Sequence, residues 1–214
     1  MHVEWAGQEM VLSPERAVYW PKRKTIIIAD PHFGKGAFFS GKGVPVPAGV
    51  MESDLRRLTD LLRDFKSKRL VVLGDFYHAR GGVAGHTSDV LSAWRKENPR
   101  VEIILVRGNH DCHAGDPDEA WNIECLQPPF YDHGIFFYHE APANPMGPTM
   151  AGHIHPAVSM RGSAGERLRV PCFWFSEQVA TLPAYGNFTG THVVRPTMGD
   201  AVVLVGPDEL VRVA

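Results

Sequence analysis

The segment RLVVLGDFYH, residues 69–78, is an aliphatic run that ends abruptly at a glycine and an aspartate. Its first five residues have the length and composition of a buried β-strand. Two other segments have the same form, TIIIADPH at residues 25–32 and VEIILVRGNHD at residues 101–111. We therefore predict strands over residues 25–29, 69–73 and 101–106, each followed at once by polar side chains.

The segments between these strands carry apolar residues at helical spacing, which predicts helices over residues 47–66 and 88–97. Alternating strands and helices predict parallel strands. After residue 116, short apolar runs separated by glycine and proline predict a second, mixed or antiparallel sheet. Its expected strands are residues 135–139, 149–154, 168–174, 178–182 and 201–205. We expect one domain over residues 1–214, of the α/β class, with two stacked mixed β-sheets flanked by helices.

Composition and charge limit the function. The chain has 214 residues, 44% hydrophobic and 21% charged, which is ordinary for a globular protein. A formal charge of -2 excludes a basic field over the whole surface. Any contact with nucleic acid must therefore rely on a local patch or on a metal site.

The cysteines and the apolar runs bear on the cellular location. Cys112, Cys125 and Cys172 form no paired framework and fit reduced thiols, with Cys112 expected to be buried and inert. No stretch has the pattern of a signal peptide or the length of a membrane helix. We therefore expect a cytoplasmic protein.

Histidines, carboxylates and one asparagine follow the expected strands. These positions are Asp30, His32, Asp75, Asn109, His139, His153 and His155. Ligands of open α/β sheets bind beyond the carboxyl ends of the strands. Each segment alone is typical of an ordinary turn, but their repetition after five strands favours a common site. Seven oxygen and nitrogen ligands exceed the four of a tetrahedral ion and suit two ions that share a carboxylate, as in enzymes that displace groups at phosphorus.

The order D-x-H, G-D-x-x-(D/H), G-N-H-(D/E), H and G-H-x-H resembles the calcineurin-like metallophosphoesterase superfamily, whose fold is an α/β/β/α sandwich. Further segments resemble the bacterial ligase-associated metallophosphoesterases (the PdeM family), which are linked with DNA repair genes. These segments are DPHFGKG at 30–36, GVPVP at 43–47, GDFYHAR at 74–80, VRGNHD at 106–111 and LPAYGNFTG at 182–190.

The resemblance implies two metal ions and a ligand set for each. One ion would be held by Asp30, His32, Asp75 and His155, and the other by Asp75, Asn109, His139 and His153. Asp75 would bridge the ions, and a hydroxide between them would attack phosphorus. His133 competes with His139 for its place. Mixed nitrogen and oxygen ligands admit Mn, Fe or Zn, and the resemblance favours Mn²⁺.

The resemblance also suggests catalytic roles for two further histidines. His110 would protonate the leaving oxygen or stabilise the transition state. His78 stands where many family members have Asp. The histidine at this position resembles the repair exonucleases of the superfamily, and His78 would act in a pair with His110. The alternative is that His78 only orients His110. Arg80 could bind a phosphate through its planar fork, and Lys35 as a point charge, although a solvated or structural role suits both.

Together these features predict a binuclear metal-dependent phosphodiesterase, a DNA nuclease in DNA repair that uses DNA as substrate and is associated functionally with DNA ligase and helicase repair proteins. The alternative enzyme is a phosphoesterase acting on a small molecule, a nucleotide or a lipid pyrophosphate, which the near-neutral charge favours. A non-catalytic scaffold is disfavoured because every expected ligand is present.

Overall fold

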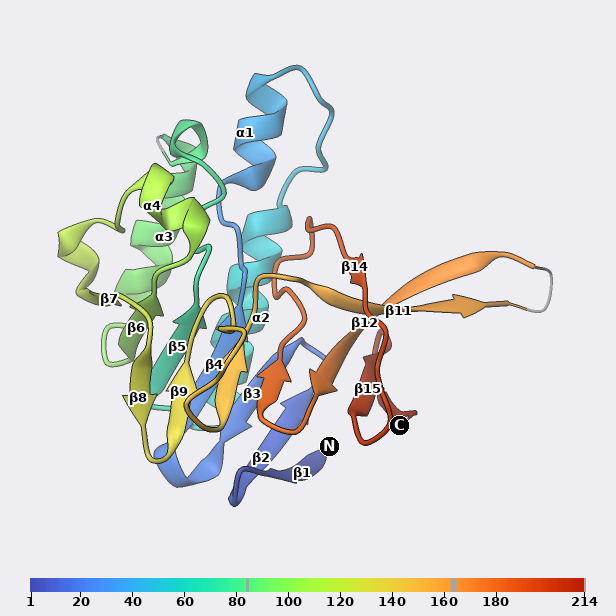
Figure 1. The fold of residues 1–214 in the computed structure, drawn as a ribbon. Coiled ribbons are helices and arrows are strands. Elements are labelled where there is room, and N and C mark those ends of the chain that lie inside the picture. Colours follow the sequence, from blue (N-terminus) through green and yellow to red (C-terminus); the bar gives the residue numbers. More distant parts are fainter. Residues whose placement is uncertain (84, 163–164, 214) are drawn as a thin grey trace.

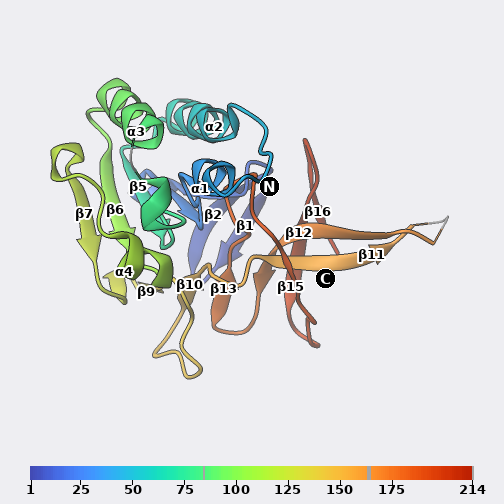
Figure 2. The same ribbon diagram turned by 90° about the horizontal axis from the view of Figure 1, so that it is seen from above.

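The computed structural model describes residues 1–83, 85–162 and 165–213. Two β-sheets stack face to face, and the longer helices gather on the outer side of the first sheet (Figure 1, Figure 2). The first sheet has the order β1-β2-β3-β4-β5-β6-β7. Its strands are β1 (His2–Trp5), β2 (Gln8–Ser13), β3 (Ala17–Trp20), β4 (Thr25–Ala29), β5 (Arg69–Leu73), β6 (Glu102–Val106) and β7 (Ile123–Leu126).

The predicted parallel unit forms the centre of this sheet. Strands β4, β5, β6 and β7 run parallel, with Ile27 beside Val71 and Val71 beside Ile104. Every residue of β4 and β5 is buried, as expected for strands covered on both faces. The antiparallel strands β1, β2 and β3, which extend the sheet on the β4 side, were not predicted.

The helices are α1 (Lys35–Gly41), α2 (Val50–Asp64), α3 (His86–Glu97) and α4 (Asn109–Ala114), with 3₁₀ turns η1 (Pro21–Arg23), η2 (Arg80–Gly82) and η3 (Glu119–Trp121). Helices α2 and α3 pack on one face of the first sheet, whereas α1 and α4 lie beyond the carboxyl ends of its strands (Figure 1). Helix α2 buries Leu55, Leu58 and Leu62 in a core cluster with Ile26 and Leu70 of the sheet. Each such burial contributes about 1.5–3 kcal/mol. Helix α2 thereby fixes its position over the strands whose ends carry the predicted ligands.

The second sheet is mixed. It contains β8 (Phe130–Asp132), β9 (Ile135–Phe137), β10 (Thr149–Ala151), β11 (Pro156–Arg161), β12 (Arg167–Phe175), β13 (Val179–Thr181), β14 (His192–Val193), β15 (Ala201–Val205) and β16 (Leu210–Arg212). Strands β9, β10 and β13 are parallel, while β11, β12 and β15 pair in antiparallel fashion. The strand predicted over 149–154 ends earlier, at Ala151, because the chain turns over residues 152–155.

A second core lies between the sheets, where Val71 and Ile104 of the first share a cluster with Phe137, Met150 and Phe173 of the second. This confirms the α/β class and the two stacked mixed sheets. Within the described residues, all helices precede β7 or lead into it, and none follows in the part of the chain that forms the second sheet.

Two further observations concern the expectations about location. Cys112 is exposed on α4, so its expected burial was wrong. None of the helices in the described ranges combines the length and the apolar character needed to cross a membrane.

Candidate metal centre

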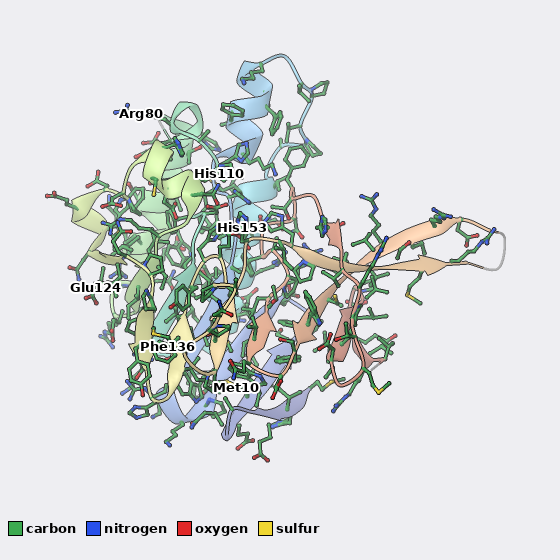
Figure 3. The ribbon with its side chains drawn as sticks, in the orientation of Figure 1. Met10, Arg80, His110, Glu124, Phe136 and His153 are labelled. Carbon is green, nitrogen blue, oxygen red and sulfur yellow. The ribbon has the colours of Figure 1, made fainter. Side chains whose placement is uncertain are left out.

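The predicted ligands converge where parallel strands of both sheets end. Asp30 follows β4, Asp75 follows β5 and Asn109 begins α4 after β6, while His139 follows β9 and His153 follows β10. Figure 3 shows His110 and His153 toward this end of the sheets and Met10 away from it. The carboxylates are almost fully enclosed, Asp30 being 0% and Asp75 3% exposed.

The backbone is strained at this convergence. Asp30, His32, Asp75, His153 and His155 all have positive φ angles, between 48° and 70°. They account for five of the eleven non-glycine residues with positive φ in the described part of the chain. This left-handed conformation is disfavoured for residues with a Cβ, and such strain clusters at functional sites. The left-handed turns therefore direct these five side chains toward one another. The conformational strain of the turns is offset by the stability of the rest of the fold.

Two glycines permit the close approach. A Cβ at Gly108 would collide with the carboxylate of Asp75, and one at Gly152 would collide with that of Asp30. Both turns thus require glycine because a neighbouring carboxylate leaves no space for a Cβ, and not because of the φ angle of the glycine itself.

One group of ligand atoms comes from Asp30, His32 and His155, which lie within 4.8 Å of one another. His155 Nε2 is 3.7 Å from Asp30 Oδ2. Its Nδ1 donates a hydrogen bond to the carbonyl of Gly190 at 3.0 Å, which leaves Nε2 as the ligand atom.

A second group is formed by Asp30, Asp75 and His139. His139 Nδ1 donates to the carbonyl of Leu73, so Nε2 is free to act as a ligand, 3.5 Å from Asp75 Oδ1 and 2.9 Å from Asn109 Oδ1. His153 Nδ1 lies 2.9 Å from the same Nε2.

Asp75 faces both groups. Its Oδ2 is 3.8 Å from His32 Nε2, and its Oδ1 approaches the free Nε2 of His139. Asp30 is a member of both groups, but it approaches His139 from the Nδ1 side, which already donates to Leu73. Asp30 and Asp75 are thus the two carboxylates placed to join the groups, and Asp75 is the one that approaches the free Nε2 of His139.

These residues fit a pair of divalent cations. Asp30 Oδ1, His32 Nδ1, His78 Nδ1 and His155 Nε2 are buried without a hydrogen-bond partner in the described part of the chain. Burial, with Lys35 and the neighbouring histidines, lowers the pKa of His32 to about 2, so the ring is neutral, the form that binds metals. Burial raises the pKa of Asp75. Carboxylates enclosed in this way need a cation to balance them.

His110 and His78 stand together beside this cluster. Their rings stack at 5.2 Å between centroids, and His110 Nδ1 donates to the carbonyl of His78. His110 Nε2 then faces the cluster, 3.9 Å from Asp75 Oδ2. Burial, with Lys35 and His110, lowers the pKa of His78 to about 4, so His78 is neutral near pH 7.

The two cations considered for substrate binding lie in different places. Lys35 is half-buried at the start of α1, where burial lowers its pKa and the Asp75 carboxylate opposes that effect. Arg80 is exposed on η2, and Figure 3 shows its side chain directed away from His110. The competing ligand His133 lies on the β8–β9 turn beside Trp20, apart from the cluster.

A buried hydrogen-bond network supports the metal centre and involves Tyr185, Asp54 and Asn187, which were not predicted as site residues. The Tyr185 N–H donates to the carbonyl of Ala29 at 2.7 Å, and its hydroxyl donates to that of Asp54 at 2.8 Å. The Asp54 carboxylate accepts from the backbone and side-chain amides of Asn187 and from Arg57. This network fixes the loop 183–190, whose Gly190 holds His155. The sequence signal for this loop was the resemblance of the segment LPAYGNFTG at 182–190.

Fold and site together define a metal-dependent phosphoesterase: two stacked mixed sheets with a buried His and Asp cluster at their carboxyl ends. The chain belongs to the calcineurin-like phosphoesterase family, whose model matches residues 23–160.

One solved structure supports this assignment over the full length of the chain. The chain is similar to the Pseudomonas putida nuclease MPE, with 36% identity, a TM-score of 0.87 and coverage of 99% of both chains. It also matches Yfce, a phosphoesterase from E. coli, with 14% identity and a TM-score of 0.43 over 87% of this chain and 90% of that one. No curated protein matches the sequence.

Proposed function

We propose that this chain, as one domain over residues 1–214, is a binuclear metal-dependent phosphodiesterase that cleaves DNA. The observation that carries the proposal is the buried His and Asp cluster, placed in a chain that is similar over its full length to a nuclease. We assign one metal to Asp30, His32, Asp75 and His155, and the other to Asp75, Asn109, His139 and His153.

When bound, two divalent ions stabilise charge on the phosphoryl oxygens and lower the pKa of water for attack. The chain's own residues orient the reaction. His110 presents Nε2 toward the cluster, where it can donate a proton to the leaving oxygen. His78 positions His110 through its carbonyl and its stacked ring. The Asp75 carboxylate accepts a hydrogen bond from the His110 backbone N–H at 3.0 Å. This bond fixes the start of α4 next to the carboxylate that would hold the metals.

A diester substrate agrees with the cations available. A phosphodiester carries one negative charge and a monoester two, so a diester requires less positive charge from the protein. The half-buried Lys35 interacts with the Asp75 carboxylate, and the exposed Arg80 is a candidate for phosphate farther along the strand.

The small-molecule alternative is favoured by one observation. A cavity of about 520 Å³ adjoins the cluster, lined by His32, Lys35, Met51 and Phe188 among others. A volume of this size, with apolar walls and a few polar groups, is typical of small-ligand sites.

Initial rates on a substrate panel separate the two functions. We would compare single- and double-stranded DNA, RNA, bis-p-nitrophenyl phosphate, p-nitrophenyl phosphate and nucleotide monophosphates, each with Mn²⁺, Fe²⁺ or Zn²⁺. The nuclease proposal expects DNA and the diester to be cleaved fastest, with Mn²⁺ the best metal. Faster hydrolysis of a monoester than of both diester and DNA would replace it with the small-molecule alternative.

The setting of this activity is also part of the proposal. We infer action in the cytoplasm in DNA repair, together with DNA ligase and helicase proteins. The support is the resemblance of segments such as GDFYHAR at 74–80, and three cysteines without a disulfide. Co-purification of a ligase or helicase with the tagged protein would test the association.

A further inference from the structure

Strands β11 and β12 form a long two-stranded ribbon that leaves the body of the protein. Figure 1 and Figure 2 both show it projecting away from the two sheets. Strand β14 pairs with β11 only at Pro156 and Ala157, and β15 and β13 pair with β12 only from Cys172 onward. Within the described ranges, residues 158–161 and 167–170 therefore pair only with each other.

The register of this ribbon collects its arginines on one face. Arg161 lies opposite Arg167, and Arg169 lies opposite Ser159. Directly opposed residues, and residues two apart on one strand, share a face. Arg161, Arg167 and Arg169 therefore form one basic face, which we call the arginine face.

The opposite face is apolar. Val158 and Val170 pack against a small core cluster at the base of the ribbon. Farther out, Met160 and Leu168 are 44% and 55% exposed. The packing at the base ties the ribbon to the body, and the arginine side chains farther out remain exposed.

The three arginines have no neutralising partner among the residues that the structure describes. All three are exposed, and none forms an ion pair or a side-chain hydrogen bond with a residue that the structure describes. Like charges directly opposite each other destabilise a strand pair, so the Arg161–Arg167 pair is a cost in the isolated protein. Such an arrangement, in a chain of net charge -2, indicates an anionic partner.

The ribbon starts at the metal centre. Pro156, the first residue of β11, directly follows the proposed ligand His155. At about 3.3 Å per residue, Ser159 and Arg161 lie roughly 13 and 20 Å along the ribbon from His155. In a duplex, 20 Å corresponds to about six nucleotides of each strand. A polyanion cleaved at the centre can therefore reach the arginine face, and a small phosphoester cannot.

We propose that the β11–β12 ribbon is a nucleic-acid-binding arm, whose arginine face contacts backbone phosphates several nucleotides from the bond being cleaved. This rests on the proposed nuclease function and adds to it the surface that binds the rest of the substrate. A two-stranded ribbon fits the major groove of a duplex, and the same arginines can follow the phosphates of a single strand.

The test compares two triple variants of equal charge. One is Arg161→Ala/Arg167→Ala/Arg169→Ala. The control is Lys68→Ala/Lys96→Ala/Arg100→Ala, which removes three exposed cations. Lys68 precedes β5, Lys96 lies in the last turn of α3, and Arg100 precedes β6, so all three lie at the amino ends of these strands, away from the metal centre. Both variants change the net charge from -2 to -5, so any difference between them reflects position.

Binding is measured by fluorescence anisotropy with labelled 30-nucleotide single strands and 30-base-pair duplexes, over a range of salt and in the His110→Ala background to slow hydrolysis. The arginine triple is expected to bind at least one of them about tenfold or more weakly, with a slope of log K against log salt that is smaller by about 2–3. The control should bind as the parent does. The loss of cleavage rate on long DNA should exceed any loss on bis-p-nitrophenyl phosphate by about tenfold.

Three outcomes decide between the proposals. Equal affinity and equal salt slopes for the arginine triple and the control would overturn the arm while leaving the nuclease intact. Neither binding nor cleavage of DNA by the parent protein would overturn the nuclease as well. If the arginine triple binds normally and Met160→Ser/Leu168→Ser changes the oligomeric state, the ribbon is an interface between copies of this chain. Thermal melting of the arginine triple, expected at or above the parent's value, excludes misfolding.

Discussion

Asp75 is held in a left-handed conformation, with φ at 50°, so that its two oxygens face different histidines. The substitution Asp75→Asn keeps the size of the side chain but removes the charge that would lie between the cations. We expect the variant to retain at most one of two metal equivalents and to lose turnover of bis-p-nitrophenyl phosphate. Metal content by mass spectrometry and initial rates measure both effects.

The matched control is Asp116→Asn, which changes a carboxylate that lies away from the cluster and pairs with Arg107. It should retain both equivalents and the rate of the parent. Two full equivalents and a normal rate in Asp75→Asn would show that this carboxylate does not bridge the metals.

His110 should matter for turnover and little for metal binding. Its Nε2 faces the cluster, and its backbone N–H, which contacts Asp75, is unaffected by a change of side chain. His110→Ala is expected to keep both metals and to lose roughly 10²–10⁴-fold in rate on DNA, whose alkoxide leaving group needs a proton. The loss should be smaller on p-nitrophenyl esters.

His2→Ala provides the comparison for His110→Ala, because His2 is an exposed histidine on the edge strand β1. It should leave the rates on both substrates unchanged. Equal losses on DNA and on p-nitrophenyl esters in His110→Ala would indicate electrostatic stabilisation instead of proton donation.

Helix α2 holds the loop 183–190 through Asp54, and the loop in turn contacts the proposed metal ligand His155. Asp54→Ala removes the acceptor of two Asn187 hydrogen bonds but leaves Arg57 paired with Glu15 at 2.8 Å. We expect a loss of about 1–3 kcal/mol in the free energy of unfolding. Because the loop also fixes His155, metal affinity should fall by roughly 10–100-fold. Urea unfolding and metal titration measure the two effects.

Asp60→Ala, an exposed position on the same helix paired with Arg63, should change neither quantity. If Asp54→Ala does not fold, Tyr185→Phe removes only the hydroxyl that contacts Asp54 and tests the same connection. Unchanged metal affinity in a folded Tyr185→Phe or Asp54→Ala protein would show that the loop does not position His155.

The elements that could be predicted are those whose signal is local. The buried strands β4, β5 and β6 are continuous apolar runs, and α2 carries an apolar stripe. Helix α4 has six residues, too few for a periodic pattern, and α1 contains two glycines. Strand β1 is only half-covered and has no buried residue. These elements form because tertiary contacts override weak local preference.

The candidate site likewise has a part that could be predicted from local sequence and a part that could not. Polar residues directly after apolar strands were visible in the sequence, and topology alone brings such positions to one edge. The contacts that support them were not visible, because Tyr185 and Asn187 meet Asp54 across 131 and 133 positions of sequence. Whether Arg80 points toward the cluster also depends on the path of η2 and not on its motif.

At the scale of the molecule, the metal centre lies where the two sheets share one core and where their parallel strands end. Asp30 and Asp75 are buried there with His32 and His139. Without cations, the carboxylates face each other in a medium of low dielectric constant, and several ligand atoms have no partner in the described structure. Bound metal should therefore stabilise the whole fold as well as the site.

Removal of metal by a chelator tests this coupling. A ligand present at 100 times its dissociation constant stabilises a protein by about 2.7 kcal/mol, which for a chain of this size corresponds to a shift in Tm of about 5–10 °C. We expect the chelated protein to melt lower by this amount and to recover on addition of Mn²⁺. The Asp75→Asn variant, with fewer ions to lose, should show a smaller shift, whereas Asp116→Asn should behave as the parent. The same Tm with and without metal in the parent protein would mean that the cluster binds ions too weakly, or too far from the shared core, to stabilise the joined sheets.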